Sequence, residues 1–550
     1  MRSLVAYWPI ALICIGLPAL AAILYGCERR PAIVIDAGDS AGERCAALLE
    51  NGIDMVRPDA LGLVSTGTTL KSDPRLAAET LSQWLRRPDC RGAVPTEPLS
   101  DDAKSLLARL LGSDGLKQVT SERLTSFEAA HIRDALLDFS TADTLSRGTE
   151  QDIDRFTRLF EYVTRTVSAQ ATGTADLPLT AYEAHLFGRG SAEDRAWLFA
   201  NLVRQLRTDA VVLRPADATD SDPWWVGVLL DDGVYLFDTS LGLPVPAPEQ
   251  ANDASGALLP RPATWAEAVA TPTLLTEYRQ QAGLDPQPID AARLQSPRVE
   301  LIGPSSFWNL AMERLELSLT EDRGVLLYDP LHSTPAGPGM YERVAAAGGS
   351  FWTADAIGVW PHTEEIRVAR QDLPASQQQR LQQRIRPYLG PVRINTKGPE
   401  PFPEPPSRDL WETRIEHMSG RSAAARGSYQ LIRLAAAPVL ANDDPSAIVD
   451  ALLSSSDQSL NSQAADEAFY WMAQAQYAER DFATAAATAQ RYIDEGGDRS
   501  DEAAGLRVLC LAAEGQTEQA AEAVAELPET IPGLRRLQWF AERWRKPAPE

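Results

Sequence analysis

The residue types that could carry out acyl chemistry lie near the middle of the chain, where His185, Ser191 and Asp238 can be written as a Ser/His/Asp set. Such a set works when the histidine takes the proton of the serine hydroxyl and the carboxylate orients the histidine. Ser191, however, directly precedes an apolar helical stripe and has Asp194 three residues later, which is the pattern of a helix N-cap. Asp238 ends a strand-like run and begins a turn. We therefore expect a capping role for Ser191 and a turn role for Asp238, with the triad as the alternative.

The elements that would position these residues can be predicted for the stretch from Gly188 to Gly242. Small or apolar side chains recur there at three- and four-residue steps, which predicts a helix with one buried face. The side chains in this stripe are Ala192, Ala196, Phe199, Val203 and Leu206. The following β-branched and aromatic runs are joined by Asp231-Asp232-Gly233, which predicts a β-hairpin because glycine tolerates the positive φ of a tight turn. A buried helix that leads into a hairpin is the expected local architecture.

This stretch resembles the core of the transglutaminase-like superfamily, whose fold is papain-like. The family pattern is G-x-C-x-D-x-A on a helix, H-A-W-x-x-V on one strand, and D-P or D-T at the end of the next strand. The positions of this chain that match the pattern are Gly190, Asp194, Ala196, Trp225, Val228, Asp238 and Thr239. The resemblance implies an α+β fold with a helix packed on an antiparallel sheet.

The resemblance also implies that the active site is degenerate. Ala192 stands at the position of the nucleophilic cysteine and Pro223 at that of the catalytic histidine, so that only the acidic third member, Asp238, is retained. Alanine has no nucleophilic atom and proline no titratable one, so the family's cysteine mechanism is impossible as aligned. The N–H groups at the start of the helix would still be available to an anion or a carbonyl oxygen, as in a binding pocket.

Composition limits the classes of function. The chain has 550 residues and a hydrophobic fraction of 44%, enough for several globular domains. Its net charge of −24 argues against a nucleic-acid partner, because binding phosphates needs clustered lysine and arginine. There is no C-x-x-C or H-E-x-x-H spacing and the five histidines are scattered, so we expect neither a metal site nor a cofactor.

Residues 1–30 are predicted to be an export signal or membrane anchor. Arg2 is followed by an uncharged run from Leu4 to Gly26, which is organised like a signal peptide and is long enough to cross a bilayer. The sequence before Cys27, Leu24-Tyr25-Gly26, resembles a bacterial lipobox, in which the cysteine is lipidated, although Tyr25 departs from the pattern. Lipoprotein and transmembrane anchor both remain open. Either one predicts a membrane-tethered protein whose bulk lies outside the cytoplasm, in the periplasm or cell envelope.

Cys45 and Cys90 are two of the three cysteines outside this leader, the third being Cys510. In an oxidising compartment Cys45 and Cys90 could form a disulfide, worth about 4 kcal/mol in the chain-entropy model. Two buried thiols are the alternative.

The rest of the chain divides by pattern into five further regions. Residues 31–148 are predicted to be mainly helical, with helices near 41–49, 75–85, 101–111 and 126–137. Residues 149–290 form the transglutaminase-like domain, which opens with a helix over 152–167. Residues 291–397 are predicted to be an α+β segment, with strands at 299–301, 313–319, 324–328 and 358–360 and a helix near 376–385. The tryptophans in this segment are expected to pack in the core rather than line a groove; they are Trp308, Trp352 and Trp360.

A proline-rich linker is predicted at 398–408, followed by an alanine-rich helical domain over 409–547. Three helical hairpins are expected there, and the last two resemble tetratricopeptide repeats. The stretches that carry this resemblance begin at Arg480 and Gly515, and small residues at Ala485 and Ala520 would let paired helices approach closely. The family's W-x2-L-G-x2-Y signature is absent, and a generic array of helical hairpins is the alternative.

Two functions remain from the sequence. The first is an exported, membrane-tethered scaffold or binding protein: a non-catalytic transglutaminase-like domain joined to repeats that hold a protein or peptide partner. The alternative is an exported hydrolase or acyltransferase of amidase or peptidase type, with a noncanonical site that includes Ser191, His185 and Asp238.

Overall fold

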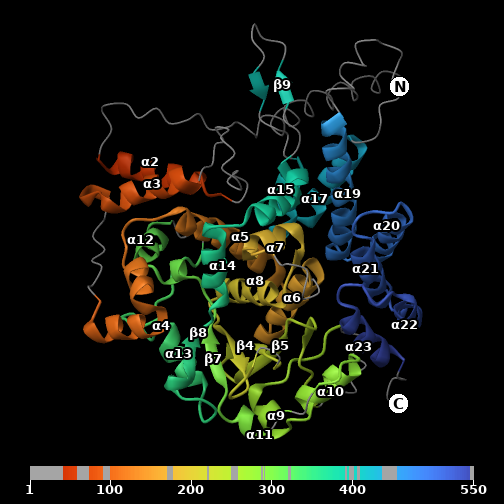
Figure 1. Ribbon diagram of the computed structural model, residues 1–550, viewed down its shortest axis with the longest axis horizontal. Coiled ribbons are helices and arrows are strands. Elements are labelled where there is room, and N and C mark those ends of the chain that lie inside the picture. The colour runs from red at the N-terminus through yellow and green to blue at the C-terminus, as the bar shows by residue number, and fades with distance from the viewer. Residues whose placement is uncertain are drawn as a thin grey trace, which may run out of the picture.

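The computed structural model describes residues 41–57, 74–90, 99–169, 177–219, 222–248, 258–286, 289, 291–319, 324–389, 393–395, 402–404, 409–435 and 455–545 (Figure 1). The architecture is mixed α and β, about 64% helical, with a small mixed sheet. The predicted α+β class is therefore confirmed at this level. The predicted leader and Cys27 lie outside the described residues. Among the helices that are described, none combines the length and the apolar character needed to span a bilayer.

The first described helices share a hydrophobic core with residues 311–315 and 325–328. The four helices predicted in this region are confirmed, and the structure joins Cys45 to Cys90 in a disulfide. The bridge ties the first helix to the short 3-10 helix that follows the second. The elements are α2 (Ala41–Asp54), α3 (Pro74–Arg86), η1 (Pro88–Cys90), α4 (Asp101–Val119) and α5 (Ser126–Ser146).

The predicted strand at 313–319 is wrong, because these residues lie in helix α12, Leu310–Ser318. The side chain of Asn309 caps this helix by accepting a hydrogen bond from the backbone N–H of Ala311 at 2.9 Å. Alternating leucines suit a strand, but Met312 and Leu315, one helical turn apart, are both buried against the N-terminal helices. Packing on those helices therefore overrides the local alternation.

The predicted strand at 324–328 is also wrong, since these residues pair with no neighbouring strand. Their backbone groups bind side chains instead. The carboxylate of Glu316 accepts hydrogen bonds from the N–H groups of Leu327 and Tyr328, at 2.7 and 2.9 Å. The side chain of Gln205 both donates to and accepts from the backbone of Leu326, at 3.0 Å each. A β-branched run whose polar groups are satisfied in this way needs no sheet.

The main sheet has six strands in the order β6-β5-β4-β3-β7-β8, and all neighbours are antiparallel except β7 and β8. The predicted hairpin is confirmed, with Leu230 opposite Gly233 at its turn. The predicted strands at 299–301 and 358–360 are confirmed as β7 and β8. The strands are β3 (Ala210–Arg214), β4 (Trp225–Leu230), β5 (Gly233–Asp238), β6 (Leu243–Pro244), β7 (Arg298–Leu301) and β8 (Ile357–Val359).

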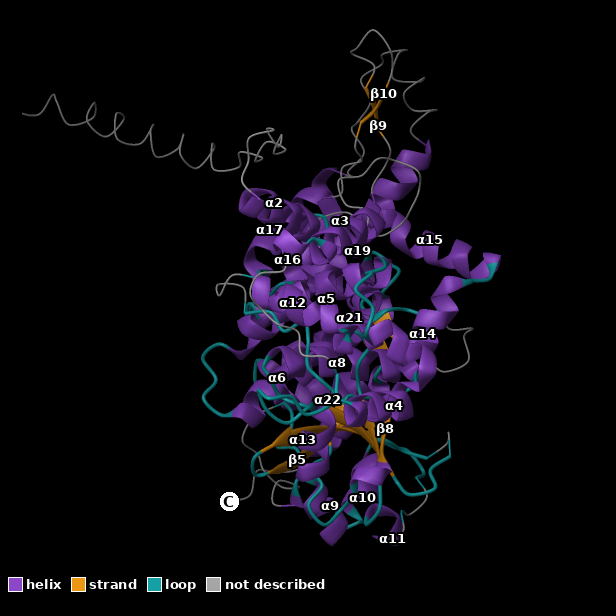
Figure 2. Cartoon of the chain, turned by 90° about the vertical axis from the view of Figure 1, so that its left-hand side faces the viewer, coloured by secondary structure: helices purple, strands orange, loops and turns teal. Residues whose placement is uncertain are grey.

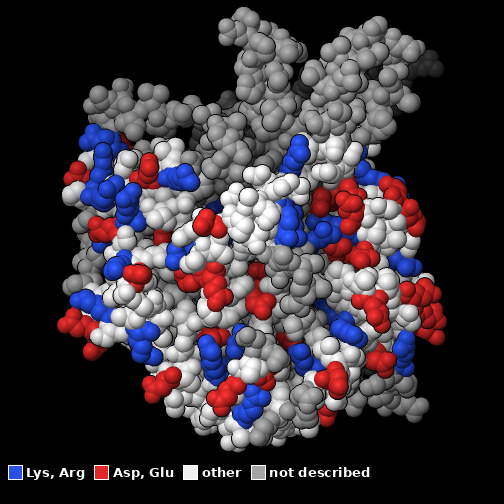
Figure 3. Space-filling model, in the orientation of Figure 1, with Lys and Arg blue, Asp and Glu red and all other residues white. Residues whose placement is uncertain are grey.

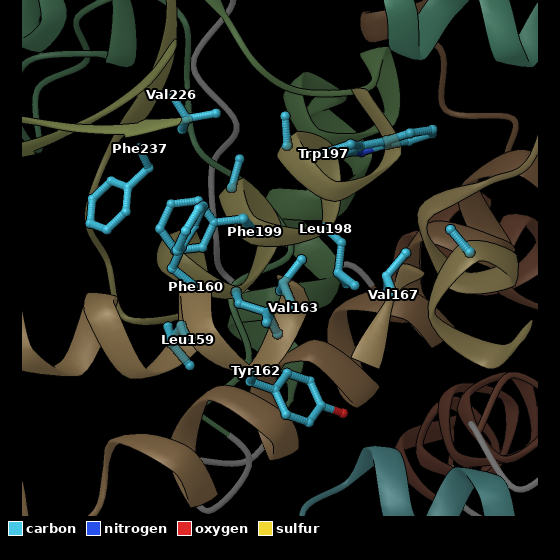
Figure 4. Close-up of a cluster of buried hydrophobic side chains, with 14 of the residues drawn as sticks. Leu159, Phe160, Tyr162, Val163, Val167, Trp197, Leu198, Phe199, Val226 and Phe237 are labelled. Atoms are coloured by element: carbon cyan, nitrogen blue, oxygen red, sulfur yellow. The ribbon is translucent and has the colours of Figure 1, made fainter. Parts of the chain in front are cut away.

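Helices α6 (Asp152–Thr166) and α8 (Ala192–Gln205) lie on one side of this sheet (Figures 1 and 2). Three short helices lie on the other side: α9 (Trp265–Ala270), α10 (Leu274–Gln281) and α11 (Ala291–Leu294). Three phenylalanines join the helices to the hairpin (Figure 4). The ring of Phe199 on α8 lies 5.2 Å from that of Phe160 on α6 and 5.0 Å from that of Phe237 on β5. The helix predicted over 152–167 is confirmed as α6, and its aromatic side chains pack in the core.

The remaining elements of the middle region lie between residues 168 and 404. Trp308, Trp352 and Trp360 are all buried, which confirms the core interpretation. Within the predicted linker, residues 402–404 pair antiparallel with 393–395, and the other linker residues lie outside the described part. The elements are β1 (Ser168–Ala169), α7 (Ala181–Phe187), β2 (Arg189–Gly190), α9 (Trp265–Ala270), α10 (Leu274–Gln281), α11 (Ala291–Leu294), η3 (Ser305–Trp308), α13 (Met340–Ala347), η5 (Ala354–Ala356), α14 (His362–Gln371), α15 (Ala375–Leu389), β9 (Arg393–Asn395) and β10 (Phe402–Glu404).

The C-terminal region is entirely helical where it is described, and the helices of the three predicted hairpins are confirmed. Their assignment to tetratricopeptide repeats stays a prediction. The helices are α16 (Asp409–Met418), α17 (Ser422–Ala435), α19 (Ser455–Ala478), α20 (Phe482–Asp494), α21 (Ser500–Ala513), α22 (Thr517–Glu526) and α23 (Leu534–Trp544).

Two buried arginines join these C-terminal helices to α7. Arg414 on α16 donates hydrogen bonds to the carbonyls of Leu186 and His185, at 3.1 and 2.7 Å. Arg499, which precedes α21, donates to the carbonyl of Phe187 at 2.7 Å. Carbonyls in the last turn of a helix lack intrahelical partners and carry the negative end of its dipole, so cations bind them favourably. The C-terminal helices therefore supply the C-terminal cap of α7.

Gly188 makes this close approach possible. It ends α7 in the left-handed conformation, at φ 62°, which a residue with a Cβ adopts only with strain. A Cβ atom at this position would also lie 2.3 Å from the ring of Trp471 on α19. The glycine therefore serves both the turn and the packing of α19 on the core.

Candidate functional site

Ser191 caps helix α8, as predicted. Its hydroxyl accepts a hydrogen bond from the backbone N–H of Asp194 at 3.1 Å, and the Asp194 carboxylate accepts one from the N–H of Ser191 at 2.8 Å. This reciprocal pair is a capping box, which satisfies two N–H groups at the helix start. Ala192 is the first residue of α8 and presents only a methyl group there. The cap therefore occupies the one hydroxyl beside the position where the resemblance places a nucleophile.

Asp238 is fully buried at the end of β5, and both of its carboxylate oxygens are occupied. Oδ1 accepts hydrogen bonds from the N–H and the hydroxyl of Ser240 and from the N–H of Leu241, at 2.9, 2.5 and 3.0 Å. Oδ2 accepts from the hydroxyl of Tyr278 at 2.8 Å and from Nη1 of Arg279 at 2.5 Å. The carboxylate thus closes the turn after β5 and anchors α10. It has no position left for orienting a histidine.

His185 is fully buried in α7 and is used by other parts of the fold. Its Nε2 lies 2.6 Å from the hydroxyl of Tyr162, and burial lowers the pKa of the imidazole well below its usual value. No hydrogen bond among the described residues joins His185 to Ser191 or to Asp238. Pro223 lies just before β4 and offers no titratable atom. The residues of the predicted alternative triad therefore do not form a working set.

The histidine that does approach the start of α8 is His362, which no sequence motif selects. It begins α14, and its Nε2 lies 3.4 Å from Oδ1 of Asp194. Its ring stacks on that of Trp360 with the centroids 4.9 Å apart. A far-separated part of the chain supplies this contact, so no local motif could have identified it. Without a free nucleophile beside it, the His362–Asp194 pair holds α14 against α8.

A groove of about 740 Å³ lies where the core meets the C-terminal helices. Its walls come from β1 and β2, from the start of α21 and from residues 529–533. Arg189 is the only cation among the residues that line it, and its Nε already binds the Glu502 carboxylate at 2.6 Å. The other charged residues that line it are acidic; they are Asp498, Asp501, Glu502 and Glu529. Figure 3 shows acidic side chains gathered on the nearby face over α20, α21 and α22.

Within the described part of the chain, no three or more His, Cys, Asp or Glu side chains are grouped so that they could hold a metal ion. The groove and three further cavities of the described chain are lined by residues other than Ala192, Pro223 and Asp238. Asp238 is buried, whereas Ala192 and Pro223 are half-buried.

Comparison with known proteins adds no relative: no family model matches the chain, and neither a curated protein nor a solved structure matches it. The resemblances to transglutaminase-like and tetratricopeptide proteins therefore rest on the motifs in the sequence alone.

Proposed function

We propose that this chain is a membrane-tethered, exported scaffold or binding protein, built on a non-catalytic transglutaminase-like core, and that its C-terminal helices serve protein–protein interaction. The observation that carries the proposal is the saturation of Asp238. The one acidic residue that the motif retains accepts five hydrogen bonds from its own fold. Ala192 and Pro223 occupy the other two positions of the motif, so these three residues contribute to the fold rather than to catalysis.

The groove beside β1 and α21 is the surface that we propose binds a protein partner. Its volume falls in the range of about 300–1,000 Å³ that is typical of ligand sites. Asp501 and Glu529 are exposed in it, and its one cation is already paired with Glu502. An excess of negative charge attracts positive charge and raises the rate of encounter. The partner we propose is therefore a protein segment rich in lysine or arginine.

The absence of turnover can be tested directly on the purified full chain. We expect no hydrolysis of generic amide or ester substrates, and no transfer of a glutamine acyl group to a primary amine, above the rate given by heat-denatured protein. The Ser191→Ala variant is the informative control, since losing the cap costs only about 1 kcal/mol of stability. A turnover that disappears in a folded Ser191→Ala variant would contradict the proposal and support a hydrolase.

The binding role can be tested with a photocrosslinking residue at Thr530, which is exposed in the groove, and a matched one at Val368, which is exposed on α14. In intact cells we expect a discrete crosslinked product at Thr530 and none at Val368. Asp501→Lys combined with Glu529→Lys should remove the product, whereas the control pair Asp355→Lys and Glu365→Lys, also exposed but outside the groove, should retain it. Equal loss in both pairs, or no product at Thr530, would contradict binding at this groove.

A further inference from the structure

A recess of about 50 Å³ adjoins the groove where α6, α8, α19, α21 and α23 meet. Its volume exceeds the ~10–15 Å³ that one water molecule needs but is far below the ~300 Å³ of a site for a drug-sized ligand. It therefore has room for a ligand of only a few atoms. The recess and the groove share four lining residues: Ser168, Glu502, Pro532 and Gly533.

Three buried arginines line this recess. They are Arg165, Arg195 and Arg536, with exposed fractions of 8%, 3% and 5%. Glu502 is the only carboxylate among the described residues of the wall, and it already binds Nε of Arg189 at 2.6 Å. The wall is therefore rich in positive charge that water does not reach freely, and a buried charge needs a counter-ion.

The carboxylates around the recess are too few to supply these counter-ions. Glu161 binds Nε of Arg165 at 3.0 Å. Asp238 acts on the charge of Arg195, but its carboxylate binds Arg279 at 2.5 Å. With the ion pair of the wall included, five guanidinium groups face three carboxylates, so two positive charges are left uncompensated. The remaining acids of the groove are exposed, and water and salt screen their charge.

Arg536 is the arginine whose donors are unused. Its Nε is buried without a hydrogen-bond partner, and among the described residues its guanidinium forms no ion pair; it lies 5.4 Å from the centroid of the Phe540 ring. Glu161 acts on its charge but is already bound to Arg165. Burial lowers the pKa of Arg536, and burial together with the charge of Arg536 lowers the pKa of Arg195 to about 9. Arg195 therefore stays charged at neutral pH beside a second, like charge.

The start of helix α23 adds an independent preference for an anion. Gly533 is its N-cap and lines the recess together with Pro532, and no side chain caps the helix. The first N–H groups of a helix lack intrahelical partners and carry the positive end of its dipole. In this 11-residue helix they begin at the wall of the recess, which is the usual setting of a bound oxyanion.

We propose that this recess binds one small, doubly charged oxyanion with the chemistry of phosphate, held by Arg536, by the charge of Arg195 and by the start of α23. Two uncompensated positive charges match the charge of about −1.5 to −2 that a phosphate group carries at pH 7. The forked donors of a guanidinium suit its oxygens, and the volume admits the phosphate group and little else. Inorganic phosphate and the phosphate group of an ester that enters from the groove share this chemistry. The proposal does not depend on the protein partner proposed for the groove.

Two adjacent arginines of α23 provide a matched pair of variants. Arg536→Gln removes the charge from the recess. Arg535→Gln makes the same change one residue earlier, at an exposed side chain that hydrogen-bonds Gln538 and does not line the recess. Because Arg536 has no carboxylate of its own, we expect Arg536→Gln to fold and to be at least as stable as the original chain in phosphate-free buffer. Arg536→Lys keeps the charge and loses only the forked donors.

The experiment is isothermal titration calorimetry on the purified full chain at constant pH and ionic strength. Inorganic phosphate, O-phosphoserine, acetate and chloride are titrated separately. We expect one phosphate per chain, an affinity roughly tenfold weaker in Arg536→Gln, a smaller loss in Arg536→Lys and no change in Arg535→Gln. Tighter binding of O-phosphoserine would identify an ester as the ligand, and tighter binding of inorganic phosphate would identify the free ion.

Four results would overturn the proposal. The first is that neither phosphate ligand shows saturable binding to the unmodified chain. The second is that a folded Arg536→Gln variant binds phosphate as tightly as the original. The third is that Arg535→Gln weakens binding as much as the substitutions at Arg536. The fourth is that acetate or chloride binds as tightly as phosphate, because the recess would then not select for two charges. If Arg536→Gln fails to fold, the comparison of Arg536→Lys with Arg535→Gln still decides the question.

Discussion

Asp238 and Asp138 are both buried aspartates of this fold, and their surroundings are opposite. Asp238 receives five hydrogen bonds, one of them from the guanidinium of Arg279. Asp138 lies near another carboxylate and lines a cavity between α5, α8 and η3. A sequence motif points to Asp238, but both of its carboxylate oxygens are already hydrogen-bonded within the fold. No motif points to Asp138, yet three residues that line its cavity carry buried polar atoms without hydrogen-bond partners; they are Trp197, Arg204 and Ser306.

The largest effect is expected from Asp238→Ala. The substitution leaves the buried end of Arg279 without its counter-ion and the hydroxyl of Tyr278 without its acceptor, so we expect a loss of about 3–5 kcal/mol in the free energy of unfolding, measured with urea. Asp231→Ala, in the exposed turn of the same hairpin, should change it by less than about 0.5 kcal/mol. A stable Asp238→Ala protein would show that the saturated carboxylate is not structural.

His131 lines the same cavity as Asp138, and its buried, neutral state can be tested by lowering the pH. Because the pKa of His131 is lowered to about 4 in the folded state, the unfolded chain takes up a proton below pH 6.5 while the folded chain does not. Stability attributable to His131 should therefore fall as the pH drops from 6.5 to 4, by about 3 kcal/mol in total. His131→Gln keeps a donor for the Leu327 carbonyl and should show a correspondingly smaller loss over this range. Parallel pH profiles of the two proteins would contradict a neutral, buried His131.

The smallest effect is expected from Asp138→Asn, and its sign is the opposite of that for Asp238. A raised pKa means that the unfolded chain loses its proton above pH 3.8 while the folded chain keeps it, so Asp138 lowers stability as the pH rises. The amide cannot ionise, so the variant should be more stable than the original at pH 7 and equal to it near pH 3.5. Chemical denaturation at the two pH values measures the difference. A variant that is less stable at pH 7 would mean that Asp138 is ionised in the folded protein.

Sequence patterns predicted the structural elements that depend on residues close together in the chain. The cap formed by Ser191 and Asp194 is visible because its two residues are three apart. The hairpin at Asp231-Asp232-Gly233 is visible because a short polar turn separates two strand-like runs, although Gly233 does not adopt the positive φ that the prediction assumed. The helix over residues 313–319 could not be inferred in this way, since the alternating leucines suit a strand and the helix depends on the burial of Met312 and Leu315 against the N-terminal helices.

The candidate sites were predicted less well, because each depends on contacts between distant segments. His362 meets Asp194 only once α14 has packed on α8. The cavity between α5, α8 and η3 forms only when these three elements pack together, and none of the residues that line it belongs to a sequence motif. A buried polar atom without a hydrogen-bond partner can be recognised only when the surrounding atoms are known.

The arginine cap on α7 has a consequence for how the chain can be divided. Arg414 and Arg499 come from C-terminal helices, yet they satisfy the last carbonyls of a helix in the core. Cutting the chain after the sheet would leave those carbonyls and the surface around Gly188 without their covering. The two regions are therefore one cooperative unit, and the C-terminal helices are not an appended module that can be exchanged freely between proteins.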